Sequence, residues 1–165
     1  MRQQEIAEAL AYLYWMRDRI AAAAGQLSEA QFRSDVPSAT RSLRGTLAHQ
    51  LECEWAWRIR LTTGAFPDED VFAPEDFASA GALAERWREE EQAVRTWIAT
   101  LTDDALAARP PGDGNTLARW RYLAYVVNHG TQQFSEAAVL LTRMSCSPGE
   151  IGYLEFCMQQ SNPSR

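Results

Sequence analysis

Apolar residues recur every three or four positions along most of this chain, and that spacing is the strongest limit on its fold. In an α-helix such spacing gathers the apolar side chains on one side. The alternating apolar and polar pattern of a half-buried strand is almost absent, and no Asn-Gly or Asp-Gly turn joins two apolar runs. The sequence therefore predicts an all-α fold.

Four segments are long and periodic enough to form the main helices. They span about residues 4–24, 42–63, 79–101 and 115–144. Gly25 and Gly64 end the first two, Ser79 caps the third, and the breaker sequence RPPGDGN precedes the fourth. Four amphipathic helices bury their apolar stripes most simply in a four-helix bundle. A chain of 165 residues has room for one such domain, which we expect to span residues 1–165.

The segments between these helices also carry structural signals. LSEAQF at residues 27–32 and LTDDAL at residues 101–106 each place an acidic residue after a hydroxyl cap, so each predicts a one-turn helix. SPGE at residues 147–150 makes a turn that starts a short C-terminal helix. The loop between the second and third long helices contains Pro67 and Pro74 and is long, so periodicity alone leaves the topology open.

The pattern also assigns two helix faces. The fourth long helix is expected to turn a seam of three-and-four spacing toward the bundle. This seam consists of Leu117, Trp120, Ala124, Val127, Thr131, Phe134, Ala138 and Leu141. On the third long helix, the acidic run Glu89, Glu90 and Glu91 is expected to face solvent.

Charge and composition limit the expected partners. Sixteen Lys and Arg against twenty-two Asp and Glu give a net charge of -6, which disfavours a phosphate-binding surface, so we expect no nucleic acid partner. The N-terminal segment lacks the pattern of a secretory signal, and no apolar run approaches the length of a bilayer span. We therefore expect a cytoplasmic protein without a membrane partner. The three cysteines have no C-x-x-C spacing, which favours reduced thiols.

The chain has two histidines, and each lies on a second face of a predicted helix. Residues spaced by four form one line along a helix. The two lines are His49, Cys53 and Trp57 on the second long helix and Tyr125, His129 and Gln133 on the fourth. Where both helices face one cleft, His49 and His129 supply two nitrogen ligands to a divalent metal, and Gln133 a third, weaker oxygen ligand. The alternative is two half-buried histidines that hydrogen bonds satisfy.

Two segments resemble the DinB/YfiT-like family. TLAHQLECEWAWRIRL at residues 46–61 is similar to the family's second-helix signature, with His49, Glu54 and Trp57 at the matching positions. YVVNHGTQQFSEAAVLLTRMSCSPGEIGYLEF at residues 125–156 resembles the fourth helix and the SPG turn that follows it. Together with the other helix patterns, the resemblance covers essentially the whole chain.

This resemblance implies a four-helix bundle with a long crossover connection, often as a homodimer. Members of the family bind zinc or nickel through one histidine of the second helix and two of the fourth. Some use a low-molecular-weight thiol: mycothiol, bacillithiol or glutathione. The resemblance makes His49 and His129 the first two ligands and places Gln133 where the third histidine is expected. Phe134 and Tyr125 stand where relatives commonly have an arginine and a further histidine.

Three functions are compatible with these residues. The first is a metal-dependent thiol S-transferase or hydrolase, in which the metal lowers the pKa of a bound thiol or water. The second is a metal-free bundle that binds a small apolar or thiol-bearing molecule against Trp57, Tyr125 and Phe134. The third is a structural, dimerising protein without enzymatic activity.

Two residues near the histidines leave alternatives open. Glu54 either supports the ligands from behind and accepts a proton, or forms an ion pair with an arginine such as Arg17, and we favour the ion pair. Cys53 is a reactive thiol, a substitute ligand or an inert buried side chain. The inert side chain fits best, because the nearby sequence offers no obvious cation to stabilise a thiolate.

Overall fold

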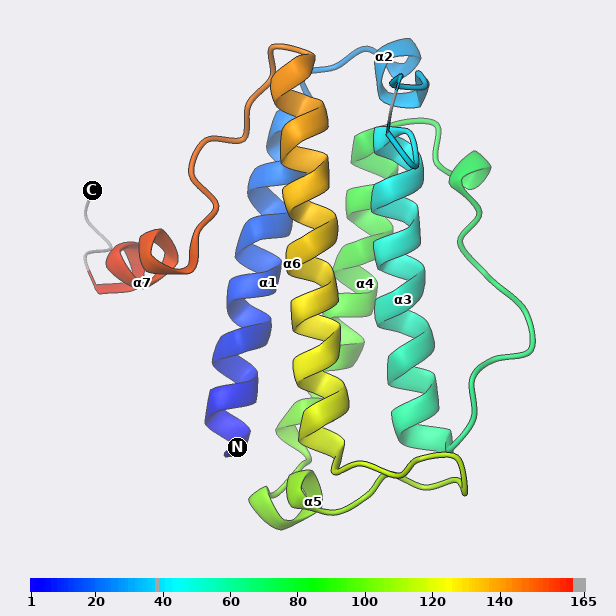
Figure 1. The fold of residues 1–165 in the computed structure, drawn as a ribbon, viewed down its shortest axis with the longest axis vertical. Coiled ribbons are helices and arrows are strands. Elements are labelled where there is room, and N and C mark those ends of the chain that lie inside the picture. The colour runs from blue at the N-terminus through cyan, green and yellow to red at the C-terminus, as the bar shows by residue number, and fades with distance from the viewer. Residues whose placement is uncertain (38, 162–165) are drawn as a thin grey trace.

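Four long helices stand side by side in the computed structural model, which describes residues 1–37 and 39–161 (Figure 1). They are α1 (Gln3–Ala24), α3 (Leu43–Thr63), α4 (Ala80–Ala99) and α6 (Arg119–Arg143). The shorter elements are α2 (Glu29–Arg33), the 3-10 helix η1 (Pro74–Asp76), α5 (Asp103–Ala107) and α7 (Tyr153–Ser161). These residues contain no strand, so the predicted all-α bundle is confirmed. None of these helices has both the length and the apolarity needed to cross a membrane.

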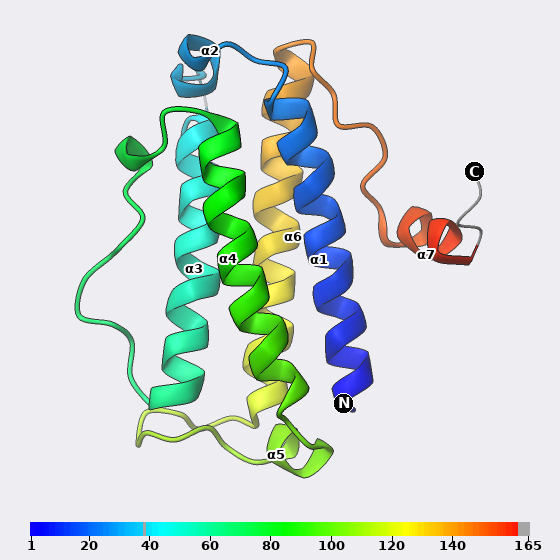
Figure 2. The ribbon, with the colours of Figure 1, turned by 180° about the vertical axis from the view of Figure 1, so that it is seen from behind.

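The long helices follow an up, down, down, up order through the bundle (Figure 1 and Figure 2). The connection that contains α2 stays at one end of the bundle, and the connection that contains α5 stays at the other. Between α3 and α4 the chain instead returns along the outside of α3 for the length of the bundle. This crossover makes α3 and α4 parallel neighbours and leaves α6 in contact with both α1 and α3.

Side-chain caps fix where several helices begin. The hydroxyl oxygens of Ser42 and Ser79 each accept a hydrogen bond from a backbone N–H three residues later, at the starts of α3 and α4. Ser28 and Thr102 cap α2 and α5 in the same way, which confirms the two predicted one-turn helices. Gly64 ends α3 with φ at 102°, a left-handed conformation that glycine adopts without strain.

Helix α6 begins later than predicted and buries a different face. Asn115 is held in the preceding loop, where its Oδ1 accepts a hydrogen bond from Arg60 Nε at 2.8 Å, and the helix starts only at Arg119. Leu117, the first residue of the predicted seam, is 47% exposed. The buried residues of α6 are Leu123, Val126, Gly130, Phe134, Ala137, Leu140 and Leu141. Of the predicted seam, Phe134 and Leu141 are buried and Trp120, Val127 and Ala138 are partly buried against the core. The seam therefore runs along the edge of the buried face and not through its centre.

Gly130 explains this shift of the buried face. A Cβ at this position would overlap Leu13 Cδ1 of α1 and lie 2.8 Å from Gln50 Nε2 of α3. The missing side chain thus lets α1 and α3 approach α6 closely. An argument from apolar spacing gives glycine no weight, so it misses the position where the helices come nearest.

Replacing Gly130 with alanine is expected to lower the free energy of unfolding by about 1 kcal/mol, because overpacking costs about 1–3 kcal/mol and better helix propensity returns up to about 1 kcal/mol. Gly81 of α4 is a matched control, since a Cβ there meets only Ser79 Oγ, at 3.7 Å. Gly81→Ala is expected to leave stability unchanged or slightly raised. Urea denaturation followed by circular dichroism measures both variants. A Gly130→Ala protein as stable as the unmodified one would contradict the close packing.

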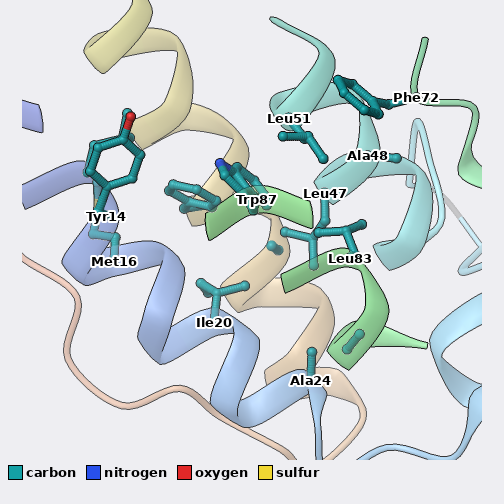
Figure 3. Close-up of a cluster of buried hydrophobic side chains, with 14 of the residues drawn as sticks. Tyr14, Met16, Ile20, Ala24, Leu47, Ala48, Leu51, Phe72, Leu83 and Trp87 are labelled. Carbon is teal, nitrogen blue, oxygen red and sulfur yellow. The ribbon is translucent and has the colours of Figure 1, made fainter. Parts of the chain in front are cut away.

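Side chains from all four long helices build the core (Figure 3). Trp87 of α4 is 1% exposed, and its ring centroid lies 5.5 Å from that of Phe134 on α6. The residues around Trp87 in Figure 3 include Ile20 of α1, Leu47 of α3 and Leu83 of α4. Trp87 therefore stands at the centre of the bundle, and its indole N–H needs a buried partner.

The acidic run of α4 is largely buried, contrary to the prediction. Glu90 is 1% exposed, and its carboxylate accepts two hydrogen bonds from the guanidinium of Arg58 on α3, at 2.6 and 2.8 Å. Glu91 pairs with Arg17 of α1 at 2.6 Å. Of the three, only Glu89 is exposed. Both neighbouring helices thus turn an arginine toward α4, which a run of like charges in the sequence does not reveal.

Helix α7 lies on the outside of the bundle against α1 (Figure 1). Phe156 is buried there, with its ring centroid 5.6 Å from Tyr12 and 5.8 Å from Trp15. The Tyr12 hydroxyl also donates a hydrogen bond to the carbonyl of Ile151 at 3.0 Å. The predicted short C-terminal helix is confirmed, but it starts at Tyr153, several residues after the SPGE turn.

Candidate metal centre

His49 and His129 lie side by side between α3 and α6, although they are far apart in the sequence. Their ring centroids are 5.4 Å apart, with the ring planes at 70°. Both side chains are half-buried. The crossover topology causes this meeting, because it makes α3 and α6 neighbours. The two imidazoles line one site and are near enough to contact one ion.

Cys53 adds a sulfur to this site. Its Sγ lies 3.6 Å from Nε2 of His49, one helical turn earlier on α3. One donor atom each from His49, Cys53 and His129 lie within 4.8 Å of one another. These three side chains form a candidate metal-binding cluster.

Gln133, the third ligand expected from the sequence, lies one turn beyond His129 on α6 and is half-buried. Its Oε1 is shielded from solvent and has no hydrogen-bond partner among residues 1–37 and 39–161. A buried amide oxygen without a partner is costly unless a ligand satisfies it. An amide oxygen left unpaired in this way is a donor that a bound cation can satisfy.

A chain of buried hydrogen bonds holds His129 from behind. Trp87 Nε1 donates to Glu54 Oε2 at 3.0 Å, and Gln50 Nε2 donates to Glu54 Oε1 at 2.9 Å. Since the Gln50 amide nitrogen is used in this way, its Oε1 accepts a hydrogen bond from Nδ1 of His129 at 2.7 Å. His129 then carries its proton on Nδ1, which leaves the Nε2 lone pair free to bind a ligand.

Sequence reasoning named Glu54 but missed Gln50. The ion pair favoured for Glu54 is not formed, because Arg17 pairs with carboxylates of α1 and α4 and Glu54 accepts hydrogen bonds instead. Gln50 is fully buried on α3 beside the apolar ridge of that helix, which consists of the buried Leu43, Leu47 and Leu51. A polar residue next to such a ridge needs a buried partner, and that is the signal that could have identified it.

Burial controls protonation at this site. It lowers the pKa of both imidazoles, and the guanidinium of Arg41 lowers both further, so the histidines are neutral at pH 7. Burial and the neighbouring Glu52 carboxylate raise the pKa of the Cys53 thiol to about 11. The Arg41 guanidinium opposes this rise only in part, so without a metal ion the thiol stays protonated, which argues against a free reactive thiol. Burial also raises the pKa of Glu54 to about 7, although its two hydrogen bonds oppose the shift.

A cavity of about 550 Å³ reaches His49 from the end of the bundle where α3 begins. Its walls come from the start of α3, the segment before it and the crossover. The charged side chains of the lining are Arg33, Asp35, Arg41, Arg44, Glu52, Asp70 and Glu75. A cavity lined in this way suits a small polar molecule better than an apolar one.

The aromatic surface expected for a metal-free binding bundle is not formed. Phe134 is fully buried against Trp87 in the core. Trp57 and Tyr125 contact each other, with ring centroids 5.2 Å apart, but Tyr125 is 48% exposed on the outside. Phe134 therefore cannot share one accessible surface with the other two.

The fold is similar to that of a solved protein, the colibactin self-resistance protein ClbS, whose crystal structure is a complex with double-stranded DNA. The two chains superpose with a TM-score of 0.59 at 14% sequence identity, over 88% of this chain and 96% of ClbS. At this identity the likeness concerns the fold alone. No curated protein matches the sequence significantly.

The net charge of the chain predicts that nucleic acid is excluded as a partner. That exclusion is wrong, because ClbS, a protein of similar fold, is solved in complex with DNA. A net charge of -6 is a sum over the whole chain and does not describe how charge is distributed over any one part of its surface. The composition of the chain therefore gives no ground for excluding DNA as a partner.

The sequence as a whole also matches a known family. The match to the DinB family spans residues 1–159, from the N-terminus into α7. It includes His49, His129, Gln133 and the buried network behind them. It agrees with the resemblance seen in the second and fourth long helices. A match over nearly the whole length of the sequence shows that this chain belongs to the DinB family.

Proposed function

We propose that the chain is a single-domain divalent-metal protein that activates a small thiol or a water molecule, as a thiol S-transferase or a hydrolase. The observation that carries this proposal is the convergence of His49 and His129 from two helices, with ring centroids 5.4 Å apart. Imidazole nitrogens suit zinc or nickel. Gln133 is proposed as a weaker oxygen donor, because its buried Oε1 has no partner in the described part of the chain.

The residues behind the site prepare it for this role. A divalent ion, when bound here, would lower the pKa of a thiol or water molecule that it contacts. Gln50 fixes the ring of His129 through the bond from Nδ1, and Glu54 fixes Gln50 in turn. Trp87 anchors Glu54 in the core. Such buried support keeps a ligand in one orientation and one tautomer.

The charged cavity beside His49 supports a polar substrate or thiol cofactor. Arg41 and Arg44 line it, and guanidinium groups bind carboxylates and phosphates well. Arg44 Nε is buried without a hydrogen-bond partner in the described ranges, and Nη2 of the same side chain lies as far as 3.7 Å from Glu75 Oε1. A small thiol with an anionic group fits the volume of about 550 Å³. These features favour a thiol-dependent enzyme over a bundle that binds an apolar ligand.

Metal content is the first test of this proposal. Protein purified without an affinity tag is expected to contain zinc or nickel, or to take up about one equivalent when the ion is added, and to lose it to a chelator. Elemental analysis after desalting measures the content. A content below about a tenth of an equivalent after both metals have been offered would contradict the metal site.

The reaction class requires a second measurement. Metal-loaded and metal-free proteins are compared in the transfer of cysteine or glutathione to an electrophilic fluorogenic reporter and in ester hydrolysis. Turnover is expected only with the metal, and equal rates in both states would contradict the proposed activation. Because ClbS was solved with DNA, a labelled duplex is titrated in parallel at two salt concentrations, since phosphate contacts weaken as salt rises.

A further inference from the structure

We infer that Cys53 is the third metal ligand of this site, bound as a thiolate, and that it holds the ion more strongly than Gln133 does. The inference rests on the metal site proposed above and specifies its ligand set. Two imidazole nitrogens, from His49 and His129, and one sulfur would then bind the ion. Three strong protein ligands leave the fourth position of a tetrahedral ion to the weak Gln133 oxygen, which a thiol or water can displace.

The geometry of α3 carries this inference. His49 and Cys53 are one turn apart on the same face of the helix, so the side chains project side by side. Atoms that share one tetrahedral ion at about 2.0–2.3 Å lie roughly 3.3–3.8 Å from one another. The distance from Cys53 Sγ to His49 Nε2, 3.6 Å, is already in this range. His129 brings its donor within 4.8 Å of both from the facing helix.

Donor chemistry separates Cys53 from Gln133. A thiolate is an anionic, soft ligand that zinc prefers, whereas an amide oxygen is neutral and hard. On binding, the S–H proton of Cys53 is released to solvent, and the sulfur lone pair forms the metal–sulfur bond. No oxidant or reductant takes part. The negative sulfur offsets one of the two positive charges of the ion, which makes the half-buried site less costly to occupy.

Cobalt(II) is the probe that tests this ligand assignment. The unmodified protein titrated with cobalt is expected to develop a thiolate-to-metal charge-transfer band in the near ultraviolet. Cys53→Ser is expected to lose the band and to bind zinc roughly tenfold or more weakly, as judged by competition with a chromophoric chelator. Gln133→Leu is expected to keep the band and to lose less affinity than Cys53→Ser does. Cys157→Ser, on the distant helix α7, is the control and is expected to change neither.

Alkylation provides a measurement that does not depend on a variant. The metal-free thiol has a raised pKa, so the reaction is run at pH 9 with excess iodoacetamide until Cys53 of the metal-free protein is alkylated. Zinc is expected to protect Cys53 of the unmodified protein under these conditions while Cys157 reacts at the same rate with and without metal, as followed by peptide mass spectrometry. Cobalt binding without the charge-transfer band, or unprotected Cys53 in the zinc-loaded protein, would overturn the inference and leave the metal site standing. Failure of zinc, nickel and cobalt all to bind would overturn both.

Discussion

Replacing Arg58 with alanine is expected to reduce the free energy of unfolding by about 3–5 kcal/mol, because the change leaves a buried carboxylate without its partner. Glu90, the carboxylate in question, is 1% exposed and receives two hydrogen bonds from the Arg58 guanidinium, at 2.6 and 2.8 Å. Urea denaturation of Arg58→Ala at pH 7, followed by circular dichroism, measures the loss.

An exposed ion pair supplies the control for this prediction. Arg33 and Glu29 pair at 3.0 Å on α2 with both side chains largely exposed. Arg33→Ala is therefore expected to cost only about 0.3–0.5 kcal/mol. The double variant Arg58→Met with Glu90→Leu is expected to recover most of the stability, since an apolar pair of similar volume leaves no buried charge. A loss below about 1 kcal/mol in Arg58→Ala would show that Glu90 finds other partners.

Replacing Gln133 with histidine is expected to raise the affinity for zinc at least about tenfold, because an imidazole nitrogen is a far better zinc ligand than an amide oxygen. The new ring would stand one turn beyond His129, on the same line of α6. Titration of zinc in competition with a chromophoric chelator measures the change. The same variant puts a strong ligand at the position that Gln133 holds weakly, so a thiol or water can no longer displace it, and tighter binding is expected to come with lower turnover.

Gln132 is the matched control, because it is the same residue type at the neighbouring position and is exposed. Gln132→His is expected to leave the affinity unchanged. Adding His129→Ala to Gln133→His is expected to abolish most of the gain, since the two rings act on one ion. Equal effects of the histidines at positions 132 and 133 would show that Gln133 does not point into the site.

Much of the bundle can be predicted from local signals. Hydroxyl caps begin α2, α3, α4 and α5, and glycines end α1 and α3. These signals act within a few residues of one another. The line of His49 and Cys53 also follows from helix geometry alone. That His49 meets His129, however, requires the crossover, and the resemblance to the family rather than periodicity supplied it.

The buried residues that were mispredicted or missed share one physical cause. Their burial depends on packing partners from distant parts of the chain. Gly130 is buried because Leu13 and Gln50 come close to it, although glycine carries no apolar signal. Glu90 is buried because Arg58 lies on the neighbouring helix. Gln50 belongs to the site because its amide bonds Glu54 on one side and His129 on the other, and His129 lies on a distant helix. None of these partners can be read from a local pattern.

The crossover has a consequence for how the protein is made. The two imidazoles come from helices that are separated along the chain by all of α4 and α5. A nascent chain that has emerged only as far as α5 contains His49 but not His129, so its metal site is incomplete. Closing this long loop comes late in folding, after the local hairpins have formed. An ion held by both rings, as we propose, would therefore bind only the finished bundle, and its binding energy would stabilise the whole molecule rather than any fragment.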